Sequence, residues 1–313
     1  MTIANISLRQ VAYLVAVADH GSMTAAAEAS QVSQASISLG INDLERRLGA
    51  RLLQRHPGQG VTLTDAGESA VRDARRVLAA VGDLQSSARS PEHRIRGRVA
   101  LGCFTTLAPF YLPPLFSSFA TLHPAVEIEV TEGSQQALRR ALLEGTCELA
   151  LTYDTGLGAG IARSRIVSGR AQVLLAAGHA LAQRQEIDLR DLADERLILL
   201  ELDPSPTNAE KLLHERGLEA DIAYRSPSIE VVRSMVAHGL GYTILVQHWA
   251  LARSVDGLPV VSRPITGPAP AFRVVAAWNE NNPPTPRSAA VIAGLRQVAA
   301  DRDSRVEQPS PSY

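Results

Sequence analysis

The stretch between residues 33 and 48 combines residue types that can read the edges of DNA base pairs. Ile37, Ile41, Leu44 and Leu48 recur at spacings of four, three and four, which predicts a helix with one buried face. The opposite face then carries Gln34, Ala35, Ser38, Asn42 and Asp43. Amides of Gln and Asn can pair with adenine in the major groove, and a methyl group can contact thymine. An ordinary amphipathic core helix has the same spacing, so the pattern alone leaves both interpretations open.

A second helix and a tight turn are expected to hold this helix in place. Residues 23–29 are rich in strong helix formers, residues 30–33 form a polar break, and Ser33 can cap the following helix. Two helices across a short turn are typical of a helix-turn-helix. Residues 8–20, ending before Gly21, predict a scaffold helix, and residues 57–60 predict the turn of a two-stranded wing.

The candidate reading helix is followed by a basic segment. The whole chain has 313 residues and a formal net charge of −1, yet Arg46, Arg47, Arg51 and Arg55 stand close together against Glu45 alone. Local positive charge, rather than net charge, neutralises phosphates. A solvated charged face is the alternative interpretation.

A long helix is predicted from Thr64 to about Ala88. Its narrow apolar stripe, which includes Ala74, Val77, Leu78, Val81 and Leu84, has no evident neighbour in the same chain. We therefore expect the stripe to pair with a second copy of the chain, which would present two heads to two half-sites. The segment 90–94 then breaks the helix and marks a domain boundary.

From residue 97 onward, strand and helix patterns alternate, which predicts a parallel sheet covered by helices. A first lobe is expected from strands at 98–103, 125–131 and 148–153, helices at 107–123 and 135–144, and a returning strand and helix at 272–277 and 286–300. A second lobe is expected from strands at 171–176, 197–200, 223–226 and 241–246, with helices at 208–216 and 229–237. The crossovers would lie near 155–167 and 262–270, and the polar segment 301–313 is expected to be disordered.

Hydroxyl groups follow several of the predicted strands, where ligands collect in open α/β sheets. They lie at Thr105-Thr106, at Ser134, at 204–207 and at Ser228, each near a predicted helix start. Single hydroxyls there are usually caps, but together they suggest a small polar or anionic ligand. The glycines at 156–160 lack a dinucleotide-binding spacing, and no hydrolase, zinc-protease or P-loop motif occurs. We therefore expect no enzyme, metal site or cofactor.

Cys103 and Cys147 are the only cysteines. They are expected at opposite ends of the sheet, too far apart to form a disulfide. The sequence has no apolar run of membrane-spanning length and no signal-peptide pattern at its start, which favours the cytoplasm.

The order and spacing of these motifs closely resemble the LysR-type transcriptional regulators. The resemblance rests on Leu8-Arg9-Gln10, on Val32 to Ser38, on the run from Ile41 to Arg55 and on Leu63 to Gly67. Three residues depart from the family pattern: Ala35 stands where Pro is common, Leu39 where a basic residue is frequent, and Gly40 where a long polar residue is frequent. Operator preference can therefore not be copied from relatives.

The resemblance implies a winged helix-turn-helix at residues 1–65, a dimerising linker helix at 66–90 and a two-lobed, periplasmic-binding-protein-like (type 2) effector domain at 91–300. Lobe I would comprise about 97–160 and 268–300, and lobe II about 165–264. The implied DNA-binding residues are Thr24, Ala25, Ser33, Gln34, Ala35, Ser36, Ser38, Asn42 and Arg55. The implied effector-binding residues are Thr105, Thr106, Ser134, Thr152, Thr207, Tyr242 and Thr243.

The partners implied are double-stranded promoter DNA, a small polar or anionic effector and further copies of the chain, as a dimer or tetramer. RNA polymerase is a further candidate partner. The alternative function is that of a ligand-independent architectural DNA-binding protein or repressor.

Overall fold

The computed structural model describes residues 5–56, 60–88, 95–203, 205–245, 252–267 and 271–306. Its N-terminal head contains three helices, α1 (Leu8–His20), α2 (Met23–Ala29) and α3 (Gln34–Leu48), and a hairpin of β1 (Leu53–His56) and β2 (Gly60–Leu63). These elements agree with the predicted helix-turn-helix and wing, although residues 57–59 of the wing turn lie outside the described residues. The helices enclose a core of Tyr13, Leu14, Val17, Met23, Ala26, Ile37, Ile41 and Leu44.

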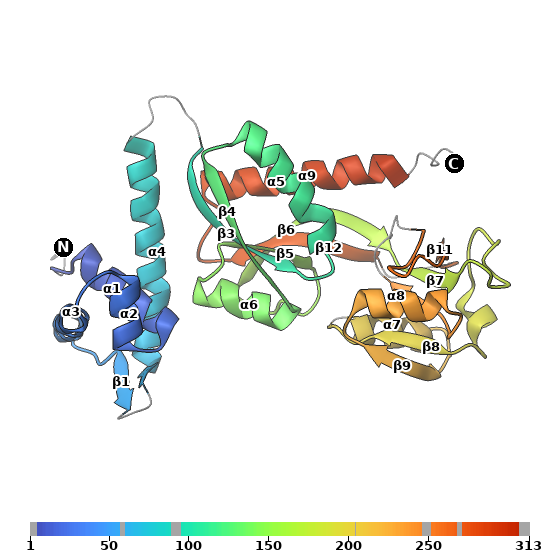
Figure 1. The fold of residues 1–313 in the computed structure, drawn as a ribbon, viewed down its shortest axis with the longest axis horizontal. Coiled ribbons are helices and arrows are strands. Elements are labelled where there is room, and N and C mark those ends of the chain that lie inside the picture. Colours follow the sequence, from blue (N-terminus) through green and yellow to red (C-terminus); the bar gives the residue numbers. More distant parts are fainter. Residues whose placement is uncertain are drawn as a thin grey trace.

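Helix α4 (Asp65–Ala88) is long; it lies along the head and continues beyond it (Figure 1). Its first turns are buried, because Val71 and Ala74 pack into the head core with exposed fractions of 3% and 6%. The expectation that the stripe has no neighbour in its own chain was therefore wrong for this half of the helix. Further along, Val77 is 44% exposed and Leu84 is 69% exposed. The predicted helix break at 90–94 lies outside the described residues.

Lobe I is built on a five-stranded sheet in the order β4-β3-β5-β12-β6. The strands are β3 (Gly97–Phe104), β4 (Val126–Gly133), β5 (Leu149–Tyr153), β6 (Ile161–Arg170) and β12 (Ala271–Asn279). Strand β3 runs parallel to β4 and β5, whereas β12 is antiparallel to both β5 and β6. The sheet is thus mixed, not parallel as expected. Strand β6 was not predicted, and it places residues 161–170 in lobe I, where the crossover and the start of lobe II were expected.

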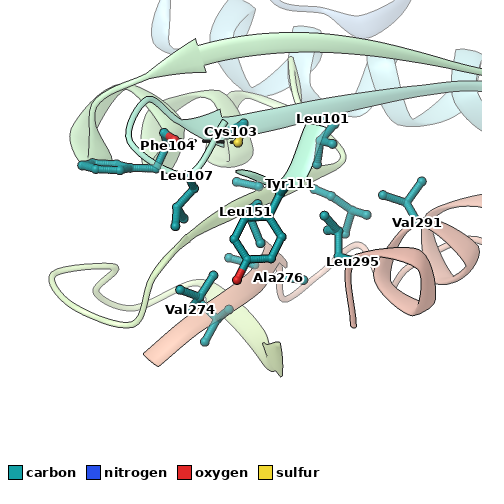
Figure 2. Close-up of a cluster of buried hydrophobic side chains, with 14 of the residues drawn as sticks. Leu101, Cys103, Phe104, Leu107, Tyr111, Leu151, Val274, Ala276, Val291 and Leu295 are labelled. Atoms are coloured by element: carbon teal, nitrogen blue, oxygen red, sulfur yellow. Dashed lines mark hydrogen bonds between the residues drawn. The ribbon is translucent and has the colours of Figure 1, made fainter. Parts of the chain in front are cut away.

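Helices cover both faces of the lobe I sheet (Figure 1). α5 (Ala108–Leu122) and α9 (Pro286–Val306) lie on one face, and α6 (Gln135–Glu144) lies on the other. Figure 2 shows Tyr111 of α5 and Leu295 of α9 directed toward Leu151 and Ala276 of the sheet. Because α9 continues to Val306, residues 301–306 are helical and not disordered as predicted. Residues 307–313 lie outside the described residues.

Lobe II contains a three-stranded sheet, β10-β7-β11, and a parallel pair, β8-β9. Its strands are β7 (Gln172–Ala176), β8 (Leu197–Leu200), β9 (Ile222–Ser226), β10 (Thr243–Leu245) and β11 (Val260–Pro264), and its helices are η1 (Leu189–Leu192), α7 (Ser205–His214) and α8 (Ile229–Ala237). Strand β11 overlaps the start of the crossover expected near 262–270, but it pairs antiparallel with β7 over its whole length. Residues 204, 246–251 and 268–270, which include parts of a predicted strand and crossover, are outside the described residues.

The two lobes touch through apolar side chains from each. Phe110 of α5 packs against both the lobe I core and the second hydrophobic cluster of lobe II, and so does Leu202, which follows β8. The guanidinium of Arg302 lies over the Phe110 ring at 4.2 Å from its centroid. This contact joins α5, α9 and the end of β8 at one point.

Candidate DNA-reading face and effector site

Capping and burial fix the orientation of α3. The Ser33 hydroxyl accepts a hydrogen bond from the Ser36 amide at 3.1 Å and lies 2.8 Å from the Ser36 hydroxyl. Both side chains therefore take part in capping the N-terminus of α3. Ile37 and Ile41 are fully buried in the head core. Gln31 supplies the tight turn before α3 with a left-handed φ of 55°, a feature that the sequence did not reveal.

The polar face of α3 is open, as predicted. Gln34, Ala35 and Asn42 are exposed and Ser38 is half-buried. Arg55 of strand β1 lies across this face, because its Nη2 donates to Asn42 Oδ1 at 2.9 Å and to Ser38 Oγ at 3.4 Å. The structure therefore brings Ser38, Asn42 and Arg55 together, with Gln34 one turn before Ser38 on the same helix. Thr24 is exposed and Ala25 half-buried in the first turn of α2.

Two residues of α3 differ from the expected pattern. Asp43 is not free for base contact, because it accepts hydrogen bonds from Gln10 Nε2 and Arg47 Nε at 2.5 and 2.6 Å and pairs with Arg46. The hydrogen bond from Arg47 is the main reason why the pKa of Asp43 is lowered. Leu48, predicted to be buried, is 45% exposed at the end of the helix.

Glu45 has a structural role that sequence reasoning missed. Its Oε1 accepts hydrogen bonds from the backbone amides of Leu52 and Leu53 at 2.7 and 3.1 Å. These bonds fix the start of strand β1 relative to α3. Strand β1 also carries Arg55. The Glu45 carboxylate beside the basic segment therefore helps to position the wing.

The linker helix also contacts lobe I. Arg75 donates through Nη2 to Asp19 Oδ1 of α1 at 2.5 Å and through Nη1 to the carbonyl oxygen of Glu144 at 2.8 Å. A cation next to the last carbonyls of a helix is favourable, and here those carbonyls belong to α6. A hollow of about 560 Å³ lies beside this contact, lined by Arg72, Arg76, Arg139, Arg140, Glu68, Asp73 and other polar residues. Arg75 thus ties the head, the linker helix and lobe I together.

In lobe I, three of the predicted effector residues meet at one edge of the sheet. Thr105 and Thr106 follow β3, and Ser134 follows β4, whose last residue Gly133 pairs with Phe104. Thr105 is exposed and Ser134 is half-buried, and Ser134 Oγ caps α6 by accepting from the Ala137 amide at 3.3 Å. Thr106 is buried, with an exposed fraction of 7%, and its hydroxyl lies 3.4 Å from the hydroxyl of Tyr153. This edge carries hydroxyl groups and the amino end of a helix.

Gln135, which the sequence did not single out, organises the wall behind this edge. Its side chain is 6% exposed, and its Nε2 donates to the carbonyl oxygens of Tyr153 and Thr155 at 2.9 and 2.5 Å. Its Oε1 accepts from the Thr152 hydroxyl at 2.5 Å. Thr152 is fully buried, so it positions Gln135 and is not exposed to an effector as expected. A polar residue at N1 of a helix beside a strand end was the only available sequence indication.

The predicted residues of lobe II lie differently from the expectation. Tyr242 is 3% exposed and packs in the core of lobe II, and burial raises the pKa of its hydroxyl to about 12. Thr243 is 1% exposed in β10. Neither residue faces Thr105 and Thr106 across an open gap, which corrects that expectation. Thr207 falls in the first turns of α7, and its side chain lies outside the described part of the structure.

Both cysteines are free and buried in lobe I. Cys103 is the last residue but one of β3 and pairs with Leu151, whereas Cys147 precedes the first residue of β5, as expected. The Sγ of Cys147 lies 3.5 Å from the position that a Cβ would take on Gly102. Successive residues of a strand face opposite sides, which places the Cys103 side chain across the sheet from Cys147. Burial raises the pKa of Cys103 to about 12 and that of Cys147 to about 11.

Among the described residues, no group of three or more His, Cys, Asp and Glu side chains could hold a metal ion. The described helices include none long and apolar enough to cross a membrane. A winged helix-turn-helix with an open polar face, a long helix and a two-lobed α/β domain together define the class of ligand-responsive DNA-binding transcriptional regulators.

The sequence matches "Bacterial regulatory helix-turn-helix protein, lysR family" over residues 8–68 and "LysR substrate binding domain" over residues 92–300. The chain belongs to the LysR family of transcriptional regulators. It is 29% identical to CfxR of Cupriavidus necator over 78% of this chain and 76% of CfxR. It is also 29% identical to the hydrogen peroxide-inducible genes activator of Pectobacterium carotovorum, over 77% of this chain and 80% of that protein.

Among solved structures, HinK of Pseudomonas aeruginosa, a LysR family transcriptional regulator, is similar with a TM-score of 0.63 and 33% identity. The similarity covers 94% of this chain and 98% of HinK. The family consists of transcriptional regulators that bind DNA and effectors and form oligomers, not of enzymes. The match to a substrate-binding domain gives no support to the alternative of a ligand-independent architectural protein.

Proposed function

We propose that this regulator reads its operator with Gln34, Ser38 and Asn42 of α3, assisted by Arg55 of the wing. The observation that carries the proposal is the hydrogen bonding of Arg55 to Asn42 and Ser38, which gathers charge and base-reading groups on one open face. On DNA, the guanidinium can exchange these bonds for a phosphate or base contact. Ser33 and Ser36 support the start of the helix through the cap that they form.

Two copies are proposed to pair through the linker stripe of Val77, Leu78, Val81 and Leu84. Val77 and Leu84 are large exposed apolar side chains on a helix whose earlier apolar residues are buried in the head. Covering them with the same stripe of a second chain removes apolar surface from water. A twofold dimer would place two heads on two half-sites of a roughly palindromic operator, and contacts between effector domains would extend the dimer to a tetramer.

The effector is proposed to be a small polar or anionic molecule bound beside the lobe I edge of Thr105, Thr106 and Ser134. The hydroxyl groups and the amino end of α6 supply hydrogen bonds and a partial positive charge. Phe110 and Leu202 pack against the cores of both lobes, and Phe110 lies four residues after Thr106, so a ligand at this edge would lie close to the boundary between the lobes. Its differential affinity for two lobe arrangements would shift the population of heads competent for DNA.

A thiol-based response to peroxide is not part of the proposal, although the name of the Pectobacterium relative refers to hydrogen peroxide. The thiolate is the reactive form of cysteine, and reactive cysteines are accessible and have a lowered pKa. Cys103 and Cys147, the only two thiols of this chain, are buried and have raised pKa values.

The test of the effector site is a metabolite screen by thermal shift, followed by a promoter-reporter assay. Thr106→Val keeps the approximate shape but removes a hydroxyl, so a ligand atom bonded to it would lose about 1–3 kcal/mol of binding free energy. DNA binding should survive in this variant. Ser228→Ala, which removes a cap in lobe II, is the matched control. Equal stabilisation of wild type and Thr106→Val by an active effector would place the site elsewhere.

A further inference from the structure

Leu39 is the most exposed large apolar side chain of α3 among the described residues. It lies halfway between Ile37 and Ile41, which are fully buried, and two residues of helix correspond to a rotation of about 200°. Its side chain therefore points away from the head core and is 69% exposed. Among the described residues of the head, none buries this leucine in an apolar environment.

The neighbours of Leu39 place it directly beside the proposed reading face. Ala35 precedes it by one turn and is also exposed, so the two form an apolar pair on the helix surface. Asn42 follows it along the same side, and Ser38 lies next to it, both bonded to Arg55. The apolar pair thus borders the polar, base-reading groups along one side.

In the major groove, the 5-methyl group of thymine is the apolar feature of an unmodified base pair. A leucine can neither donate to nor accept from the other base edges, and it would desolvate the amino group of cytosine or the carbonyl of guanine without replacing a hydrogen bond. It also has no charge for a phosphate. Leu39 is therefore suited to thymine and unsuited to the other positions that a reading helix meets.

We propose that Leu39, with Ala35 beside it, contacts the 5-methyl group of a thymine in each operator half-site and sets base preference there. The proposal rests on the proposed function, because it assumes that the outer face of α3 enters the major groove. It adds a specificity-determining residue that reads DNA by apolar contact rather than by hydrogen bonding.

The experiment uses full-length protein and an operator selected by that protein from random double-stranded DNA. Each thymine is replaced in turn by deoxyuridine, which removes only the methyl group and keeps base pairing. We expect a symmetric pair of positions at which affinity falls about fourfold for each methyl group removed. In Leu39→Ala, the same replacement should have no effect, whereas Leu39→Met should keep the sensitivity.

Leu48→Ala is the matched control, because Leu48 is an exposed leucine of the same helix that lies at its end, 45% exposed. Its deoxyuridine profile should equal that of wild type. A flat wild-type profile, or a methyl effect that persists in Leu39→Ala, would overturn the proposal. It would also be overturned if Leu39→Ala binds with the wild-type profile but fails to activate transcription, because Leu39 would then contact a protein. If the full-length wild-type protein selects no preferred sequence from random DNA, the proposed function, in which α3 reads the operator, is rejected, and the role of Leu39 is rejected with it.

Discussion

Replacing Gly40 by alanine tests how α3 is fixed against α1. Glycine inside a helix costs about 1 kcal/mol relative to alanine, so propensity alone predicts that Gly40→Ala stabilises the head. In the structure, however, a Cβ on Gly40 would lie 2.7 Å from Cδ2 and 3.2 Å from Cε2 of Tyr13. Tyr13 belongs to the head core and is 8% exposed, so its ring has little room to withdraw.

The clash should exceed the gain in propensity. Carbon atoms in contact lie about 3.5–4.0 Å apart, so the ring must move by about 1 Å. Overpacking of this kind costs about 1–3 kcal/mol, which leaves a net loss of about 1 kcal/mol in the free energy of unfolding. The sign of the effect is the diagnostic quantity, because the two contributions oppose each other.

Hydrogen exchange of the α3 amides, measured on full-length protein, reports the local free energy of opening. We expect faster exchange in Gly40→Ala. In a Tyr13→Leu background, the same substitution should slow exchange, because the ring is gone and only propensity remains. Gly82→Ala in α4 is the control, since no atom lies within 4 Å of its Cβ position, and it should stabilise its helix by about 1 kcal/mol. Slower exchange in the single variant Gly40→Ala would refute the packing argument.

Three further predictions concern the linker and the effector domain. Leu84→Glu should shift the chain toward monomer in light scattering, because it buries a charge in the proposed seam, and an unchanged mass would place the seam elsewhere. Gln135→Ala should destabilise lobe I by about 1–3 kcal/mol in urea titrations, because the carbonyls of Tyr153 and Thr155 lose their donor, and unaltered stability would contradict the assigned role. At pH 8, iodoacetamide should label Cys103 and Cys147 only after denaturation, because their pKa values are about 12 and about 11. Rapid labelling of the native protein at pH 8 would be inconsistent with these buried, neutral thiols. Because burial favours the neutral thiols, their contribution to the stability of lobe I is present below the unfolded pKa of 9.0 and is lost as pH rises toward 11–12.

Helices with a clear apolar period and a cap could be predicted from the sequence almost to the residue. Residues 8–20, 135–144 and 229–237 coincide with α1, α6 and α8. Each of these helices has a serine N-cap whose hydroxyl accepts from an amide in the first turn. Local sequence was sufficient there because the cap and the period agree.

Strands at sheet edges were harder to predict. Strand β6 is the edge strand beside β12, and it alternates between exposed arginines and partly buried residues. With these exposed polar residues, its sequence resembles a polar connection between elements. Its partner β12 is distant in the sequence, so no neighbouring strand pattern indicates the pairing. Strand β11 ends at Pro264, a residue typical of loops, yet pairs along its length with β7.

The exposed face of α3 could be predicted more fully than the arrangement of the candidate effector residues. The exposed residues of α3 follow from helical period, whereas the contact of Arg55 with Asn42 needs the wing to fold back. In the effector domain, the position of a hydroxyl residue at the end of a strand or helix does not reveal the direction in which its side chain points. Tyr242 and Thr243 are buried because of lobe II packing, which no local pattern encodes.

The position of β12 between β5 and β6 determines when lobe I can complete its sheet during synthesis. The head core comes from one continuous early segment and can form as soon as that segment leaves the ribosome. Strand β6 ends at Arg170, but β12 begins at Ala271, after the whole of lobe II has been made. At about 5–20 residues per second, the facing edges of β5 and β6 wait roughly 5–20 s for their shared partner. During that interval the nascent chain has a folded head and two unpaired strand edges, which are the places where a chaperone or a second nascent chain would bind.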